Sequence, residues 1–481
     1  MSIRITVMTL VVLFLAGYAW RNWFNALLGG IVLFAFLEHP DMPRRIAGVP
    51  GLNLWNLLFL SIGFAWLSQR AEEGSEWDIP RGVKTALWLF VTVLVLAFLR
   101  AFIDPSSFYV GTRLDLFLDY FINPLKFLLP ALMLYDGCRT RDRVFIALAA
   151  ILSVYFILAL LSIKSMGLHF DLSSGDELSA RAARRLAKDV GYHRVDLSMM
   201  LAGAGWAVIA FSFYFKRWAV KLMLCGASGV ILLGQAVTGG RTGYATWGLI
   251  GLTLCVVKWR KLLPLIPLAV AVVVIFVPAV RDRMFQGFGK TEGNFVSNTD
   301  DSEITAGRSR IWPYVIQEIE KSPVVGHGRN AMQRTGLAAW LLDSLSEEFG
   351  HPHNAYLEYL LDNGILGFLC GLPIFWLLLT RSYGLFRDRE DMVFEVTGGV
   401  ALALLLALLI AGLGAQTFYP REGVVPMWAA LAVALRVWVQ RENTVDGGPV
   451  FPEDASLDSD REESWTIADE SLQPERVSYQ G

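Results

Sequence analysis

The sequence contains little charge and little cysteine. Charged residues make up 18% of its 481 residues, whereas ordinary soluble domains carry about 25%. Hydrophobic residues make up 54%, the mean hydropathy is +0.46, and the apolar residues form blocks of membrane length. These values exclude a soluble globular protein. The net charge of −2 argues against nucleic acid as a partner.

Patterns for metal sites and disulfides are also missing. The four cysteines lie far apart and have neither zinc nor redox spacing: Cys138, Cys225, Cys255 and Cys370. No HExxH motif or carboxylate triad accompanies the histidines, so we expect no metal and no cofactor. No internal repeat is visible, which weakens the case for a transporter built from duplicated halves.

The apolar blocks predict an all-α polytopic membrane protein with about twelve transmembrane helices, or thirteen if both N-terminal blocks cross. A span needs about 20 apolar residues, or somewhat fewer in short segments. The blocks cover residues 5–20, 23–37, 52–68, 84–102, 121–136, 143–163, 195–215, 219–238, 243–257, 262–280, 355–380, 393–413 and 424–440. We interpret the first as a retained span, because a second block follows at once.

Lysines and arginines in the short loops predict the orientation, because these residues stay on the cytoplasmic side. They gather in alternate loops: Arg139, Arg141 and Arg143; Lys216, Arg217 and Lys221; Lys258, Arg260 and Lys261; and Arg381, Arg387 and Arg389. The other loops then face outward, at 103–120, 164–194, 239–242, 281–354 and 414–423. Loop 38–51 also faces outward although it holds Arg44 and Arg45, which is a minor violation.

Histidines and a second set of arginines lie on the predicted outer face. All six histidines are there: His39, His169, His193, His327, His351 and His353. So are Arg241, Arg281, Arg283, Arg308, Arg310, Arg329 and Arg334. Outward arginines run against the positive-inside tendency, and an anionic ligand at the outer membrane surface is one explanation for them.

Arg241 lies in a glycine-rich break between two predicted spans, within Val-Thr-Gly-Gly-Arg-Thr-Gly-Tyr at 237–244. Glycines let the backbone approach a ligand, and the following helix presents its N-terminal N–H groups there. The guanidinium of arginine binds phosphate through two hydrogen bonds. The alternative is an arginine that extends to the membrane interface, which does not explain three glycines in so short a turn.

Two further segments carry candidate ligand-binding residues. Arg308 and Trp312 are four residues apart, so they share a helix face and offer a cation beside an aromatic platform for a sugar or lipid headgroup. An amphipathic helix on the bilayer surface is the alternative. His351, His353 and Asn354 lie at the outer end of the next predicted span, where a histidine can transfer a proton or bind a diphosphate oxygen as imidazolium.

The alternative for His351 and His353 is a metal site, with Glu347 and Glu348 nearby. The missing HExxH and carboxylate triad spacing argues against it. Gly364 and Gly367, three residues apart in the same span, predict close packing against another helix.

These segments resemble the O-antigen ligase and polymerase superfamily. The family's His-Asn, nine residues, Gly-x-x-Gly pattern is matched by His353-Asn354 followed by Gly364 and Gly367. Arg241 is similar to the family's arginine after a Ser/Gly pair, and Arg308 to the arginine four residues before a tryptophan in its long periplasmic loop. The resemblance covers roughly residues 230–380.

The resemblance implies a bacterial inner-membrane glycosyltransferase of the GT-C-like type that is inverting and metal-independent. It would transfer a glycan from an undecaprenyl-diphosphate carrier to an acceptor hydroxyl on the periplasmic side. Arg241 and Arg308 would hold the diphosphate, and His353 would orient or deprotonate the acceptor. We expect Arg310, Trp312, His351, Asn354 and Arg329 to bind substrate. Two departures matter: Gly240 replaces the commoner serine, and His351 offers a second candidate for proton transfer.

The acceptor stays open between core lipid, a growing polysaccharide and protein. A transporter of lipid-linked glycans is a competing class, although transporters place ionisable residues at mid-membrane, and a structural membrane protein is another. The predicted parts are N-terminal spans at 1–230, a catalytic region at 231–440 with the loop 281–354, and a disordered cytoplasmic tail at 441–481. The tail holds 11 acidic and 3 basic residues, so the remainder carries 39 basic and 33 acidic residues.

Overall fold

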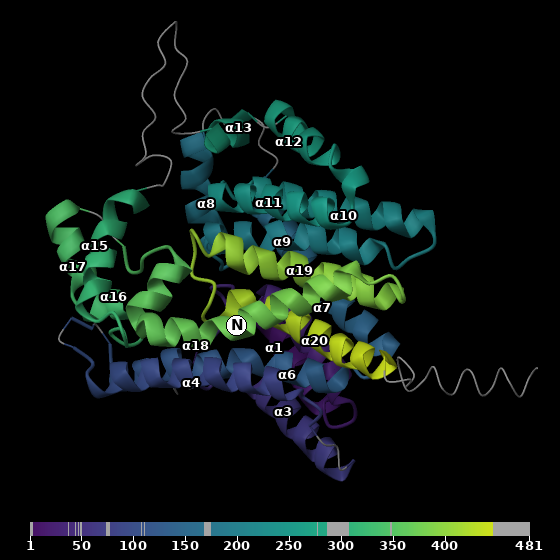
Figure 1. The fold of residues 1–481 in the computed structure, drawn as a ribbon, viewed down its shortest axis with the longest axis horizontal. Helices are drawn as coiled ribbons and strands as arrows, with labels where there is room; N and C mark the ends of the chain where they lie inside the picture. The colour runs from purple at the N-terminus through teal and green to yellow at the C-terminus, as the bar shows by residue number, and fades with distance from the viewer. Residues whose placement is uncertain are drawn as a thin grey trace, which may run out of the picture.

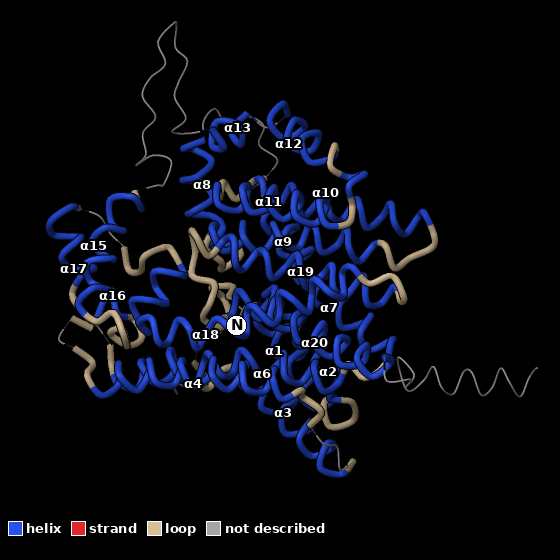
Figure 2. Tube along the Cα trace, in the orientation of Figure 1, coloured by secondary structure: helices blue, strands red, loops and turns tan. Residues whose placement is uncertain are grey.

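A computed structural model describes the chain from residue 3 to residue 445. Residues 37, 44, 47, 49, 50, 74–76, 107, 110, 168–174, 277, 286–306, 347 and 348 are left out. Within the described residues all regular structure is helical and no strand occurs (Figure 2). The predicted all-α class is confirmed. The predicted contributions of Arg44, His169, Glu347 and Glu348 lie outside the described residues.

Eight helices of the described chain are long and apolar enough to cross a membrane. They are α4 (Arg81–Ile103), the run of α5 (Arg113–Phe117), η2 (Leu118–Ile122) and α6 (Asn123–Gly137), α7 (Arg141–Met166), α9 (Arg194–Ser212), α10 (Trp218–Ala236), α18 (Ala355–Arg387), α19 (Met392–Ala411) and η4 (Glu422–Val424) with α20 (Val425–Val445). The chain is therefore a multi-pass membrane protein. The predicted total of twelve or thirteen spans stays a prediction.

The other predicted spans also form helices. They are α1 (Ile3–Tyr18), α2 (Trp23–Leu33), α3 (Leu54–Glu72), α11 (Arg241–Val257) and α12 (Leu265–Phe276). Helix α20 runs five residues past residue 440, the predicted end of the last span and start of the tail, and residues 446–481 of the tail lie outside the described part of the chain. Hydropathy located these helices because burial in lipid and burial in protein both select apolar side chains.

Helix α9 forms the centre of the bundle, against α10, α11 and α19 (Figure 1). Small residues allow these helices to approach closely. A Cβ atom built on Gly203 of α9 would lie 2.7 Å from the Ala407 side chain of α19, and one on Gly234 of α10 would lie 2.8 Å from Ala159 of α7. The central helices therefore pack backbone to backbone, which fixes the relative positions of their ends.

The basic loops gather at one end of the bundle. Lys258 and Glu395 lie 2.8 Å apart, Arg141 and Asp391 also lie 2.8 Å apart, and Arg441 pairs with Asp388. The opposite end carries the short helices that the hydropathy did not predict: α8 (Gly175–Asp189), α13 (Pro278–Phe285), α15 (Arg308–Lys321), α16 (Ala331–Arg334) and α17 (Leu337–Leu345) (Figure 1). This separation agrees with the predicted alternation of basic and non-basic loops.

Helix α18 is broken at Gly364, where φ is +64° and ψ is −172°. The segment 323–328 lies along the break and bonds to its backbone on both sides. His327 N donates to Leu361 O (2.9 Å) and Gly328 N to Asp362 O (2.7 Å), while Pro323 O and Val324 O accept from Ile365 N (2.8 Å) and Leu366 N (3.0 Å). These bonds satisfy backbone groups that the break would otherwise expose to lipid.

The predicted role of Gly364 in helix packing is wrong. A Cβ atom there would lie 2.4 Å from the backbone of Val324, and the positive φ also favours glycine. Gly367 does face another helix, since its Cβ would lie 3.3 Å from Val93 of α4. The two glycines of the motif therefore have different functions: one breaks the helix and the other lets α4 approach.

Candidate functional site

The N-terminal ends of α9 and α11 touch at the end of the bundle opposite the basic loops, and the N-terminal end of α18 contacts the last residues of α19 beside them. Ser198 Oγ of α9 donates to Gly240 O (2.9 Å), and Ala355 N of α18 donates to Gly412 O (2.7 Å). Arg308, the first residue of α15, extends to this junction, where its Nη1 lies 3.5 Å from Thr242 Oγ1 of α11. Residues 241, 308 and 353 thus come from separate segments to one place.

The glycine-rich turn before α11 has a structural reason. Gly239 has φ +64°, and its carbonyl accepts from Arg194 Nη1 (3.0 Å) and Arg283 Nε (3.3 Å). Cβ atoms on Gly240 and Gly243 would lie 2.6 Å and 2.0 Å from Ser198 Oγ. The glycines therefore allow α9 and α11 to touch, and this contact places Arg241 at the first position of α11, two residues before the predicted block at 243–257.

Four arginines surround this turn, and Arg194 was not predicted. The guanidinium charges of Arg241, Arg283 and Arg308 all act on that of Arg194. Arg283 lies 3.5 Å from the Asp176 carboxylate. Arg194 and Arg308 have no carboxylate within ion-pair distance among the described residues. Burial lowers the pKa of Arg308. Arg194 and Arg308, two neighbouring cations without a carboxylate partner among the described residues, favour an anionic ligand.

The rings of His351 and His353 lie against each other at a tilt of 38°, beside Arg308. Their ring centroids lie 3.9 Å apart, and His353 N donates to His351 Nδ1 (3.2 Å). His353 has φ +50°, which is uncommon for a residue with a side chain and occurs where the surroundings hold the backbone. Asn354 caps α18 by accepting from Tyr356 N (3.0 Å) and Leu357 N (3.2 Å).

Trp312 of α15 is hydrogen-bonded to the backbone of the histidine segment. Its indole Nε1 donates to Pro352 O, between the two histidines, at 3.0 Å. Trp312 and Arg308 share one side of α15, as predicted, but the described contact of Trp312 is with the protein backbone. Arg310 is exposed on the same helix. Trp312 thereby couples the position of Arg308 to that of His351 and His353.

Both histidines are neutral at neutral pH. Burial lowers the pKa of His351 to about 4, with the charge of Arg421 adding to the effect. Burial lowers the pKa of His353 to about 2, with the charges of His351 and Arg308 adding. A neutral imidazole can accept a proton, whereas the predicted imidazolium form is unfavourable until an anion binds nearby.

Acid is expected to destabilise the protein through these histidines. Their pKa values in the folded protein lie below the ordinary value of 6.5, so the unfolded chain takes up protons first as the pH falls. Their contribution is therefore constant above about pH 6.5 and is lost as the pH falls toward 4. Each histidine should cost roughly 1–2 kcal/mol at pH 5. The melting temperature should change less between pH 5 and 8 in the double variant His351→Gln/His353→Gln than in the wild-type protein. An equal change in both proteins would contradict this.

Arg329 belongs to a second cluster, which it forms with Glu358 and Asp362 of α18, roughly one to two helical turns after the histidines. Its Nη1 donates to Asp362 Oδ2 (2.8 Å) and to Glu358 Oε1 (3.2 Å), and its guanidinium lies 3.4 Å from the ring centroid of Tyr419. Tyr419 OH donates to Asp362 Oδ2 (2.9 Å) and Gln416 Nε2 to Glu358 Oε1 (2.8 Å). Two carboxylates therefore match the charge of Arg329, unlike that of Arg308.

Loop 412–421 closes the site from the remaining side. Arg421 Nη2 donates to Asp196 Oδ1 of α9 at 2.6 Å. His193, the N-cap of α9, lies in the same charge environment, and burial lowers its pKa. The sequence placed both loops on the outer face but singled out neither Arg194 nor Arg421. The signal that identifies Arg194 and Arg421 is an arginine at the start of a helix that follows a predicted outer loop.

One family comparison bears on this region. A model described as O-antigen ligase matches residues 226–372, from the middle of α10 to beyond the break in α18. No curated protein matches the chain. The matched segment contains Arg241, Arg308 and His353, the three residues that the structure brings to one junction.

Proposed function

We propose that this chain is a glycan transferase of the O-antigen ligase/polymerase superfamily, and the family match over residues 226–372 supports the proposal. It moves a glycan from an undecaprenyl-diphosphate carrier to an acceptor hydroxyl at the periplasmic face of the bacterial inner membrane. The observation that carries this proposal is the position of the Arg308 side chain beside the start of α11. It is a partly buried cation without a carboxylate partner among the described residues. A diphosphate has the charge that such a site lacks.

In this mechanism Arg241 and Arg308 bind the diphosphate together with the N-terminal N–H groups of α11. The acceptor oxygen attacks the anomeric carbon from the face opposite the carrier, so the configuration inverts. The bond from that carbon to the diphosphate oxygen breaks, and both arginines stabilise the charge that develops on the leaving group. The proton of the acceptor hydroxyl passes to a histidine.

The hydrogen bond between the histidines supports His353 as that base. Because His351 Nδ1 accepts from His353 N (3.2 Å), neutral His351 carries its proton on Nε2 and can only donate there. His351 therefore suits a phosphate or sugar oxygen. Its predicted substrate-binding role is kept, and proton transfer is assigned to His353.

Loss of the base gives a direct test of the function. We expect His353→Ala to lower transfer from purified undecaprenyl-diphosphate glycan in proteoliposomes by about 10²–10⁴-fold. His351→Ala should have the smaller effect on kcat because it removes a binding group. Arg387→Ala, an exposed arginine at the opposite end of α18, is the control for insertion and charge. Near-normal transfer by His353→Ala would contradict the assignment.

Metal independence is the next expectation. Transfer should continue in EDTA, because the arginines supply the charge that a divalent ion would otherwise provide. Loss of transfer in EDTA and its recovery with added Mg²⁺ or Mn²⁺ would contradict this. The same proteoliposomes, supplied with core lipid, a second lipid-linked repeat or protein, distinguish a ligase, a polymerase and a protein glycosylation enzyme by which acceptor becomes covalently modified.

A further inference from the structure

A large cavity lies beside the candidate site and is lined by none of the residues predicted from the motifs. Its volume is about 1000 Å³, and residues of loop 38–53, α3, η2, α6 and Glu422 line it. We call the junction around Arg194, Arg241, Arg283 and Arg308 the arginine site. Glu422 directly follows Arg421, which pairs with Asp196 of α9 at this junction. The two sites therefore adjoin at Arg421 and Glu422.

The cavity carries side chains suited to sugar hydroxyls. Amides line it at Asn53, Asn56 and Asn123, and aromatic rings at Trp55 and Phe59. Amides and carboxylates exchange hydrogen bonds with hydroxyl groups, and flat rings cover the apolar faces of sugars. This combination distinguishes the cavity from a lipid-filled gap between helices.

Its charge is opposite to that of the arginine site. Four carboxylates line the cavity (Glu38, Asp115, Asp119 and Glu422), against Arg45 and Lys126. Lys126 Nζ donates to Asn123 Oδ1 (2.8 Å) and Asn56 Oδ1 (3.1 Å), and three of these carboxylates act on its charge. An ionisable residue in a spanning helix marks a path for polar ligands. The excess of carboxylates repels phosphate.

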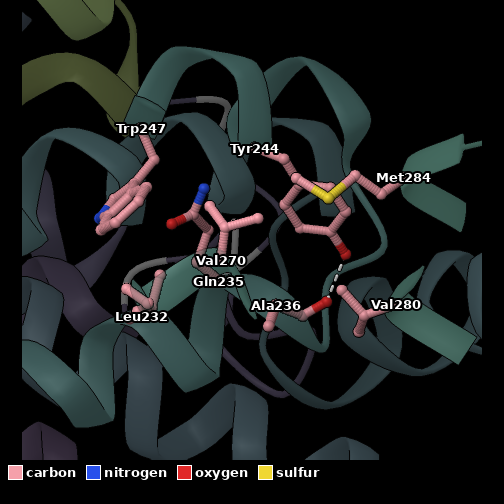
Figure 3. A pocket seen from close by; sticks show the side chains of 9 residues that line it. Leu232, Gln235, Ala236, Tyr244, Trp247, Val270, Val280 and Met284 are labelled. Carbon is pink, nitrogen blue, oxygen red and sulfur yellow. Dashed lines mark hydrogen bonds between the residues drawn. The ribbon is translucent and has the colours of Figure 1, made fainter. Parts of the chain in front are cut away.

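An apolar cavity continues past the same helix. Leu125 and Leu129 of α6 line both the large cavity and a second one of about 230 Å³ between α4, α6, α18 and α20, where most of the other side chains are aliphatic. This volume suits part of a hydrocarbon chain. By contrast, the apolar pocket around Tyr244 and Trp247 in Figure 3 holds about 40 Å³, too little for a sugar ring or a lipid chain.

We propose that these two cavities bind the acceptor of the reaction, a glycolipid with an uncharged sugar headgroup. The headgroup lies in the large cavity among the amides, rings and carboxylates, and the hydrocarbon chain lies along α6 in the apolar one. The identification as acceptor rests on the proposed transferase function. The diphosphate donor and the uncharged acceptor then occupy adjoining sites of opposite charge, which keeps each substrate out of the other's site.

Photolabelling of the full-length protein in nanodiscs tests this site without requiring transfer. The probe is a diglucosyl diacylglycerol with a photoreactive headgroup. Asn56→Trp and Leu60→Trp, one helical turn apart on α3, each place an indole ring in the large cavity where the headgroup would lie, and should lower labelling at least about tenfold. Leu57→Trp, on the same helix but outside the cavity lining and 39% exposed, should leave labelling unchanged. Excess phosphatidylglycerol should not compete.

Equal labelling of all three tryptophan variants would overturn the proposal, and effective competition by phosphatidylglycerol would overturn the preference for an uncharged headgroup. Arg308→Ala should keep full labelling, because it changes the donor site only. Failure of the transferase function is distinguishable: the labelling pattern would hold while wild-type protein transferred no glycan to any acceptor. Normal acceptor KM values in folded Asn56→Trp and Leu60→Trp would show that the cavity does not serve the reaction.

Discussion

Arg308→Ala is expected to lower glycan transfer by about 10²–10³-fold while leaving thermal stability unchanged or higher. The loss follows because this guanidinium stabilises the charge on the departing diphosphate. Stability is retained because Arg308 makes one long contact, 3.5 Å to Thr242 Oγ1, and has no carboxylate partner among the described residues. Removing a partly buried charge without a partner relieves an unfavourable desolvation term.

Transfer in proteoliposomes and thermal unfolding, measured on the same preparation, check this prediction. Arg308→Lys should recover part of the activity, since it keeps the charge but not the two-pronged hydrogen bonding. Arg387→Ala is again the matched arginine control, exposed and far from the junction. A lower melting temperature accompanied by normal transfer would give Arg308 a structural role instead.

Arg329→Leu is expected to have the opposite outcome, a loss of about 3–5 kcal/mol in stability. The substitution leaves the buried carboxylates of Glu358 and Asp362 without the cation that both contact, at 3.2 Å and 2.8 Å. It also removes the contact with the Tyr419 ring. Transfer should fall because less folded protein remains, with KM for the donor little changed in the folded fraction.

A compensating variant separates this cause from a binding role. Arg329→Leu combined with Glu358→Gln and Asp362→Asn removes both unpaired charges and should recover much of the lost stability. If Arg329→Leu kept its melting temperature and instead raised the KM for the donor, the substrate-binding role predicted from the sequence would be supported. The two arginines thus give a contrast of activity against stability within one chain.

The sequence predicted the membrane-length helices well, because a helix surrounded by lipid or by other helices needs apolar side chains along its whole length. It also placed Arg241 in the turn next to a helix start, since the glycines and the next apolar block locate that turn, although the helix begins two residues earlier than predicted. It did not predict the pairing state of the outward arginines: Arg308 and Arg329 have the same loop context, yet only Arg329 meets carboxylates. The carboxylates lie about 30 residues further along the chain, and only the folded chain brings them together.

Local sequence was also insufficient for Gly364 and Trp312. A glycine in an apolar block is typical of helix packing, and its backbone break depends on a segment some 40 residues upstream. Trp312 has the spacing of an aromatic platform, but its N–H bonds to Pro352 O because the histidine segment folds back onto α15. Arg194 was missed because it directly precedes a predicted span, and hydropathy does not indicate where a side chain at the end of a span points.

The break in α18 turns the spacing of the motif into a length. Between Gly364 and Asn354 the helix advances about 15 Å, at 1.5 Å per residue, from the break, which segment 323–328 holds in place, to the neighbouring rings of His351 and His353. One residue inserted there would rotate His353 by about 100° about the helix axis, away from Arg308. The same insertion after Gly367 would fall beyond the break and leave the outer half in place. The nine residues between Asn354 and Gly364 thus fix the distance and the orientation of His353 relative to the break.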